Sequence, residues 1–114
     1  MRAADNRQPM LKRSLEGLVS LFSISDEQAM WRVRMQADHR AFALLVDRWR
    51  ERIRALCARM TGNLHTAEDL AQETFARIYD KRADYDPSRR FATWLWRIAL
   101  NQCYDELRRA QRRA

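Results

Sequence analysis

The sequence predicts an all-α protein, a compact helical bundle of about four helices that follows an N-terminal extension. Only two glycines and two prolines occur among the 114 residues, too few for the many tight turns of an all-β fold. Apolar residues instead recur at spacings of three and four, the pattern of a helix with one buried face. A chain of this length forms one domain and can bury a modest core without disulfides or metal.

Residues 1–24 form the predicted extension, and the bundle occupies residues 25–114. The extension begins with polar residues and continues with apolar ones at helical spacing, namely Leu11, Leu15, Leu18, Val19 and Phe22. This pattern fits a short amphipathic helix that docks on the body or on a partner, and it equally fits a disordered tail. The sequence leaves both interpretations open.

Two helices are predicted next. Ser25 followed by Gln28 matches a capping box, so the first helix runs from Asp26 to about Gln36. Asp38 is the predicted N-cap of the second helix, and Gly62 ends it as a left-handed C-terminal residue. The inward-facing residues of the two helices are expected to be Met30, Val33, Phe42, Leu45, Val46, Trp49, Ile53, Leu56 and Met60.

The third predicted helix is capped by Thr66, with Asp69 at the capping-box position. Its expected buried residues are Ala67, Leu70, Ala71, Thr74, Phe75 and Ile78. Its other face carries an acidic stripe, which consists of Glu68, Asp69, Gln72, Glu73 and Asp80. Glu68 and Asp69 complement the positive helix N-terminus, but this does not account for Glu73. A docking surface for a basic partner helix is the alternative explanation of the stripe.

The last predicted helix runs from Asp86 to Arg113, with Asp86 as N-cap and Pro87 in the first helical position. The loop before it, residues 82–90, fits either a recognition pocket or a plain turn. The helix combines aromatic rings with a C-terminal run of arginines, which suits the stacking of unpaired bases and the binding of phosphates. An aromatic core stripe with a solvated basic tail is the other interpretation. Trp94 lies beside the polar row of the helix and is the aromatic residue least needed by a core.

The net charge of +7 comes overwhelmingly from arginine, because Lys12 and Lys81 are the only lysines. The predicted partner is therefore acidic, with nucleic acid first and a membrane surface second. Cys57 and Cys103 lie far apart in the sequence among apolar neighbours, without a CxxC motif, and are expected to be reduced, buried thiols. The two histidines are isolated from each other and from the cysteines, so no metal or other cofactor is expected.

The sequence contains no acid–base pair, nucleophile constellation or glycine-rich phosphate loop, so we do not expect an enzyme. It also contains no run of the length of a membrane span and no intact signal sequence. We therefore expect a cytoplasmic protein that is not exported.

Two segments, AEDLAQETFARIY (residues 67–79) and FATWLWRIALNQCYDELRR (residues 91–109), closely resemble conserved region 2 of bacterial sigma factors, in the extracytoplasmic-function (ECF) group. The likeness extends from about Asp26 to Arg113. It implies an all-helical bundle that docks on the β′ clamp helices of the RNA polymerase core. It further implies capture of the promoter −10 element as single-stranded DNA, on the non-template strand, and regulation by an anti-sigma factor.

Residue by residue, the resemblance assigns Asp69, Gln72 and Glu73 to polymerase binding. Residues 83–88 match the segment that cradles a flipped base, Phe91 and Trp94 match aromatic positions that border the start of melting, and Arg97 and Asn101 match positions at the upstream edge of the element. The DNA-binding residues expected in all are Tyr85, Ser88, Arg90, Phe91, Trp94, Arg97, Asn101, Arg108 and Arg109.

The chain departs from the housekeeping pattern of two adjacent tryptophans. Leu95 follows Trp94, and the second indole is displaced to Trp96, which a helical wheel turns toward the core. Region 4, the helix-turn-helix that reads the −35 element, is expected to be absent because the chain ends at Ala114, just past region 2. The competing interpretation is a helical protein-interaction module with no DNA-binding role of its own. A duplex-binding helix-turn-helix regulator fits poorly, because its recognition helix would carry too many tryptophans.

Overall fold

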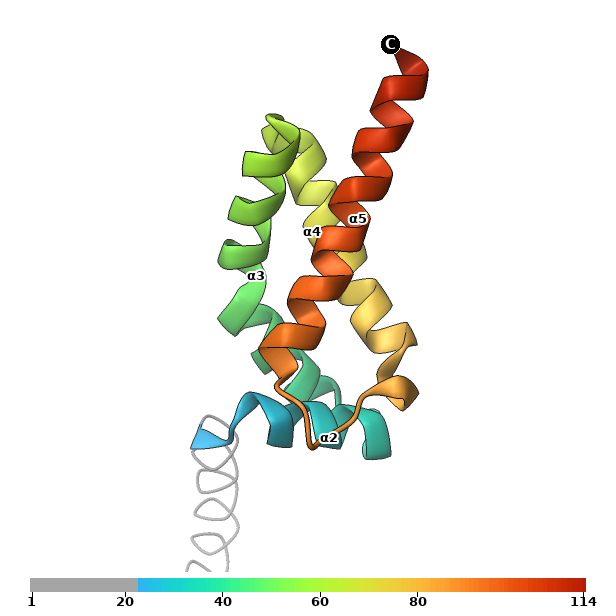
Figure 1. Ribbon diagram of the computed structural model, residues 1–114. Coiled ribbons are helices and arrows are strands. Elements are labelled where there is room, and N and C mark those ends of the chain that lie inside the picture. Colours follow the sequence, from blue (N-terminus) through green and yellow to red (C-terminus); the bar gives the residue numbers. More distant parts are fainter. Residues whose placement is uncertain (1–22) are drawn as a thin grey trace, which may run out of the picture.

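The protein is an all-α bundle, as the sequence predicts (Figure 1). The computed structural model describes residues 23–114, and within them it contains four α-helices, a short 3₁₀ helix and no strand. Their bounds are α2 (Asp26–Gln36), α3 (His39–Thr61), α4 (Leu64–Asp80), η1 (Arg82–Asp84) and α5 (Phe91–Arg113). Residues 1–22, most of the predicted extension, lie outside the described part.

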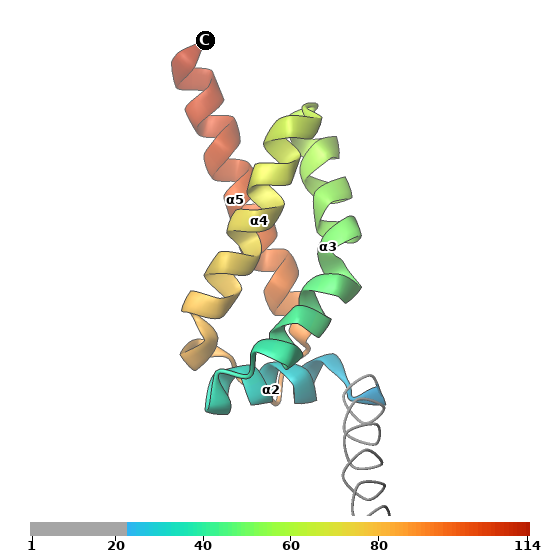
Figure 2. The same cartoon turned by 180° about the vertical axis from the view of Figure 1, so that it is seen from behind.

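Three long helices, α3, α4 and α5, lie side by side, and α2 crosses beneath one end of them (Figures 1 and 2). The loop between η1 and α5 passes next to α2. At the other end of the bundle, the last turns of α5 extend beyond α3 and α4. The start of α5 is therefore packed into the molecule, whereas its C-terminal end projects from it.

The predicted boundaries of α2 and α3 are confirmed. The Ser25 hydroxyl accepts a hydrogen bond from the Gln28 N–H at 3.0 Å, and the Gln28 side chain accepts one from the Ser25 N–H at 2.9 Å, which completes the capping box. The Asp38 carboxylate accepts hydrogen bonds from the first two N–H groups that follow His39. Gly62 ends α3 with a φ of 68°, in the left-handed region that favours glycine.

The predicted start of α4 is wrong by three residues. The helix begins at Leu64, and its N-cap is Asn63, whose side chain accepts a hydrogen bond from the Thr66 N–H at 3.0 Å. Thr66 is thus the third residue of the helix and not its cap. An asparagine side chain caps a helix as well as a threonine does, and Gly62 leaves only this one residue between α3 and α4.

The predicted start of α5 is also wrong. The helix begins at Phe91, and residues 86–89 form a turn in which the Arg89 N–H donates to the Asp86 carbonyl at 3.0 Å. The Asp86 carboxylate does not cap the helix, because it accepts hydrogen bonds from the N–H and the hydroxyl of Ser88. Pro87 belongs to this turn and not to the first turn of α5.

The core lies where the four helices face one another. All six residues predicted for the inner face of α4 are buried, and α5 buries Phe91, Leu95, Ile98, Ala99, Gln102 and Cys103. Within α2 and α3, Met30, Val33, Leu45, Trp49 and Ile53 are buried, whereas Phe42, Val46, Leu56 and Met60 are half-buried at its edge. Cys57 and Cys103 are free and buried, as predicted, although the fold brings their sulfur atoms to 3.5 Å.

Candidate nucleic-acid interface

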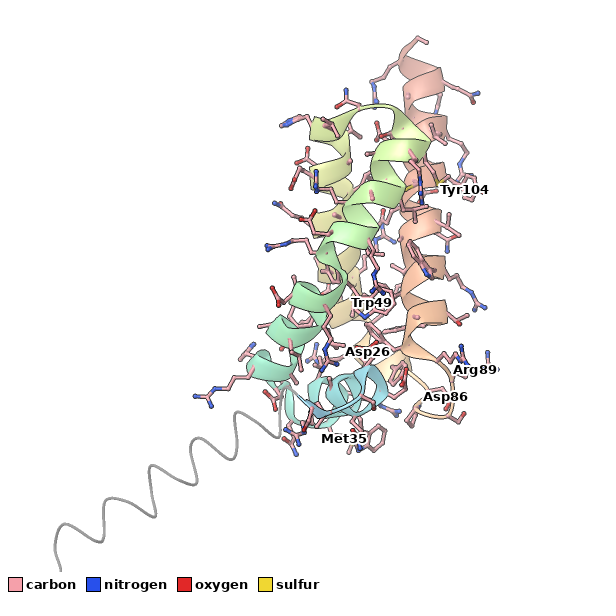
Figure 3. All side chains as sticks on the ribbon, turned by 90° about the vertical axis from the view of Figure 1, so that its left-hand side faces the viewer. Asp26, Met35, Trp49, Asp86, Arg89 and Tyr104 are labelled. Carbon is pink, nitrogen blue, oxygen red and sulfur yellow. The ribbon has the colours of Figure 1, made fainter. Side chains whose placement is uncertain are left out.

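A pocket of about 250 Å³ opens between the loop that precedes α5 and the first two turns of that helix. Its walls carry two aromatic rings and several charged side chains. The lining residues are Asp84, Tyr85, Asp86, Arg89, Arg90, Thr93, Trp94 and Arg97. Figure 3 shows Asp86 and Arg89 on the loop beside the start of α5.

Tyr85 forms the inner wall of this pocket. Its side chain is only 1% exposed, and its hydroxyl donates a hydrogen bond to the Arg89 carbonyl at 3.1 Å. Its ring packs against Phe91 and Trp94, with centroid distances of 6.2 and 5.2 Å. Burial, reinforced by the nearby carboxylates of Glu27 and Asp86, raises the pKa of Tyr85 to about 12. The phenol therefore stays neutral and holds the loop in place.

The rim of the pocket is organised by Asp86. Its carboxylate accepts hydrogen bonds from the Ser88 hydroxyl at 2.7 Å and from the Ser88 N–H at 2.9 Å, and it lies 3.7 Å from the Arg89 guanidinium. The Ser88 hydrogen bonds, supported by the charge of Arg89, hold the pKa of Asp86 below its usual value. The charged carboxylate thus keeps this exposed turn in one shape.

Helix α2 fixes both ends of the loop. The Glu27 carboxylate accepts a hydrogen bond from the Phe91 N–H at 2.8 Å, and the Arg34 guanidinium donates one to the Tyr85 carbonyl at the same distance. Arg90 occupies the N-cap position of α5, and its side chain makes no capping hydrogen bond. Glu27 therefore satisfies one of the free N–H groups at the start of α5 and places a negative charge at the positive end of the helix.

The side of the pocket that faces solvent is formed by α5. Trp94 is half-buried, and its ring leans on Tyr85, while Thr93 and Arg97 are exposed. The lining contains three arginines against two aspartates, and one of those aspartates is already engaged by Ser88. The pocket thus combines an aromatic ring with a positive surround, an arrangement that suits a base and its phosphates.

The other expected DNA-binding residues differ in position and exposure. Arg97, Asn101 and Arg108 are exposed and follow one another along the outer face of α5. Phe91 is fully buried and packs against Trp49 and Trp94, so in this structure it supports the rings around it and offers no surface of its own. Ser88 and Arg90 are exposed on the loop.

The arginines at the end of α5 are partly neutralised within the helix. Arg108 pairs with Asp105, and Arg109 lies 3.3 Å from Glu106, which also accepts a hydrogen bond from Arg113 at 2.7 Å. Among the described residues, Arg97 has no acidic partner within ion-pair distance. The positive charge available to a phosphate is therefore concentrated nearer the pocket than the run of arginines in the sequence indicates.

The displacement of the second tryptophan from position 95 to position 96 has a structural reason. Leu95 is fully buried, and Trp96 is half-buried against Trp49, with ring centroids 6.5 Å apart in an edge-on arrangement. The second indole therefore faces α3, on a different side of α5 from Trp94. Only one tryptophan of α5 lines the pocket.

The acidic stripe lies on the outer face of α4, and its residues precede those that line the pocket in the sequence. Asp69 and Gln72 are exposed, and Glu73 is half-buried. Because α4 begins at Leu64, Asp69 stands in its second turn, where the interaction with the helix N-terminus has already fallen off. Among the described residues no arginine or lysine lies within ion-pair distance of Asp69 or Glu73, although the His65 side chain lies 3.9 Å from Asp69 and the Arg54 guanidinium lies 3.6 Å from Glu68. Helix capping and local pairing therefore do not explain Glu73.

Several residues of the pocket were missed by the sequence reasoning. Thr93 lines it and stands next to the assigned Trp94 in the sequence, so proximity was an available signal. Glu27 and Arg34 hold it from α2, more than 50 positions away along the chain. No local pattern marks such residues before the fold is known.

Nothing in the described part of the chain points to a metal centre or a membrane span. No group of three or more histidine, cysteine, aspartate or glutamate side chains is arranged to hold an ion. None of the helices between residues 23 and 114 is both long enough and apolar enough to cross a bilayer.

Comparison with known proteins identifies the family. The family model described as Sigma-70 region 2 matches residues 45–113. The chain is 47% identical over 74 residues to the ECF RNA polymerase sigma factor SigW of Bacillus subtilis, a match that covers 65% of this chain and 40% of SigW. It is 40% identical over 82 residues to the ECF RNA polymerase sigma factor SigG of Mycobacterium tuberculosis, covering 70% of this chain and 22% of SigG. The chain thus spans less than half the length of these relatives.

A solved structure shares the fold. It is the NMR structure of an engineered region 2 of sigmaE in complex with GTAAAA, which is 33% identical to this chain and superposes with a TM-score of 0.72, covering 79% of this chain and 93% of that one. Sequence and fold agree, and this chain belongs to the sigma-70 region 2 family, in its ECF group.

Proposed function

We propose that this domain binds RNA polymerase through α4 and captures the non-template strand of a promoter −10 element with the pocket at the start of α5. The observation that carries the proposal is the pocket itself, in which Trp94 and Tyr85 stand among three arginines. The related region 2 of sigmaE was solved in complex with GTAAAA, and the similarity of the two folds supports the same use here.

The energy terms favour a strand that is already unpaired. Extruding a base from a duplex costs a few kcal/mol, and each lost stacking step costs about 1.4 kcal/mol. One aromatic stack returns about 1–3 kcal/mol per base. Since Trp94 is the one tryptophan of α5 in the pocket, the domain alone recognises single-stranded DNA, and the polymerase is needed to hold a duplex open.

The polymerase contact is assigned to Asp69, Gln72 and Glu73. The support is that these side chains follow one another at helical spacing on α4 and that no arginine or lysine in the described part of the chain pairs with the two acids. A basic partner surface, the β′ clamp helices, would supply the missing charge. The synthesis of RNA then belongs to the polymerase, and an anti-sigma factor is the proposed regulator.

The first test is selection from a randomised pool of short labelled single strands, with binding followed by fluorescence anisotropy and the retained strands sequenced. Enrichment of one short motif is expected, and it should disappear with Trp94→Ala but not with Tyr104→Ala. Tyr104 is the matched control because it is an exposed aromatic residue on the same helix outside the pocket. Binding that depends only on salt, with no motif enriched, contradicts strand capture by the domain itself.

If no motif is enriched, a pull-down with polymerase core decides the rest of the proposal. Retention of the domain by the core would leave the docking assignment in place, with base selection dependent on the polymerase. Failure of both experiments would favour a helical interaction module with no DNA-binding role.

A further inference from the structure

Helices α3 and α5 bring two thiols together in the core. Cys57 and Cys103 are 46 positions apart in the sequence, both have no exposed surface, and their sulfur atoms lie 3.5 Å from each other. The two sulfurs of a disulfide are about 2.05 Å apart. The two sulfurs must therefore approach each other by about 1.5 Å to form a bond.

We propose that Cys57 and Cys103 form a modification site, at which a hydroperoxide converts the two thiols into a disulfide that joins α3 to α5. No part of the proposed DNA or polymerase contact uses either residue. The inference therefore stands on the sulfur contact and is independent of the proposed function.

The chemistry uses one peroxide and two thiols. One cysteine, as its thiolate, attacks an oxygen of hydrogen peroxide, which breaks the O–O bond, forms a sulfenic acid and releases one water. The second sulfur then attacks the sulfenic sulfur, so that the S–S bond forms and the hydroxyl group leaves as a second water. The thiols lose two electrons and two protons, and the peroxide is reduced to two waters.

The site is protected in the closed fold. Burial raises the pKa of both thiols, that of Cys57 to about 12, and a protonated thiol is a poor nucleophile. Oxidation therefore requires a transient separation of α5 from α3. The end of α5 projects beyond the other helices (Figures 1 and 2), so opening can begin there without disturbing α2.

Once the site has opened and one thiol has been oxidised, the expected product is the disulfide. Once one sulfur is a sulfenic acid, its nearest reactive neighbour is the other thiol, since these are the only two cysteines of the chain. The product ties α5, which carries Trp94, to α3, which packs on α4. Oxidation then removes the opening motion itself, and a reducing thiol restores it.

The test treats the whole chain with hydrogen peroxide while far-UV circular dichroism reports the fold. The thiol titre, measured after denaturation, is expected to fall from two to zero, with a faster monomer band on a non-reducing gel and unchanged helicity. The thermal midpoint is expected to rise by about 10 °C, because the link constrains the unfolded chain. Dithiothreitol should reverse each change.

Two comparisons keep the test decisive. Cys57→Ala and Cys103→Ala each retain one thiol and should show no rise in midpoint on oxidation. The same peroxide dose applied to the urea-unfolded parent chain serves as the control for reagent strength. The proposal is overturned if the folded chain keeps both thiols under a dose that oxidises the unfolded chain. It is also overturned if the product is a linked dimer, or if helicity or the thermal midpoint falls.

Discussion

The Glu27 side chain accepts a hydrogen bond from the backbone N–H of Phe91, with 2.8 Å between the two atoms, and so α2 caps α5. This contact joins residues 64 positions apart, and it fixes the place where α5 begins. Arg34, which is also on α2, donates a hydrogen bond to the Tyr85 carbonyl. The shape of the pocket therefore depends on α2, although α2 contributes no lining residue.

Glu27→Ala is expected to destabilise the fold by about 1 kcal/mol, because it leaves a helix N–H without its acceptor. It should also weaken single-strand binding, since the start of α5 is no longer held against the loop. Urea unfolding and anisotropy measure the two effects. Glu51→Ala is the control: Glu51 is exposed and, within the described part of the chain, pairs with Arg54 on its own helix, so a change within about 0.5 kcal/mol is expected. Equal losses in the two variants would mean that the cap has no special role.

Trp94→Ala is expected to weaken binding of a single-stranded −10 sequence by about 1–3 kcal/mol, the value of one lost base stack. The helix should remain folded, because Trp94 is only half-buried at the edge of the core. A fluorescence titration with the strand selected from the randomised pool measures the loss. Tyr104→Ala should leave the curve unchanged, and an unchanged curve for Trp94→Ala as well would return Trp94 to a purely structural role.

The double charge reversal of Asp69→Lys with Glu73→Lys is expected to reduce affinity for polymerase core by at least about 100-fold, because like charges then face each other across the contact. Helicity should not change, since Asp69 is exposed and Glu73 has no ion pair in the described part of the chain. The matched control is Asp47→Lys with Glu51→Lys on α3, which makes the same charge change at the same spacing on an exposed face. If both doubles bind alike in a pull-down, the stripe is not the docking surface.

The predictable parts of the fold are those whose signals are local. The capping box of Ser25 and Gln28 and the N-cap of Asp38 each use groups within three residues, and both were predicted correctly. At the start of α5 the prediction from local residues was wrong, because the Asp86 carboxylate accepts a hydrogen bond from Ser88 and does not cap the helix. The group that accepts a hydrogen bond from the Phe91 N–H is the Glu27 carboxylate. A sequence window contains the competing local bond but not the distant one.

The same division applies to the candidate site. Helical spacing alone predicted that Trp94 lies beside the polar row of α5. In the structure Trp94 is half-buried and lines the pocket. Spacing gave no warning that Tyr85 would be buried, because its burial depends on α2 and on the rings of α5. It also gave no warning that Cys57 and Cys103 would touch, since their contact follows from how α3 and α5 pack.

Tyr85 gives the protein a defined alkaline limit. The pKa of Tyr85 in the fold is raised to about 12, whereas the pKa of a tyrosine in an unfolded chain is about 10. Its contribution to stability is thus fully present below pH of about 10 and is lost as the pH rises toward about 12. Tyr85→Phe should lose less stability over this window than the parent, although it starts lower at neutral pH because the bond to the Arg89 carbonyl is gone. Urea unfolding at a series of pH values measures this, with Tyr104→Phe as the exposed control. Parallel curves for parent and Tyr85→Phe would contradict the assignment.

Gln102 is a buried polar residue of α5 whose side-chain nitrogen has no hydrogen-bond partner among the described residues. An unpaired buried donor costs about 1–3 kcal/mol, so Gln102→Met, which keeps the volume and removes the amide, should raise the free energy of unfolding by about 1 kcal/mol. Thr74→Val is the comparison, because Thr74 is equally buried but its hydroxyl donates to the Leu70 carbonyl at 2.8 Å, and no gain is expected there. Neither change should alter strand binding, since both side chains face the core. A loss of stability in Gln102→Met would mean that the amide makes a bond that its packing does not reveal.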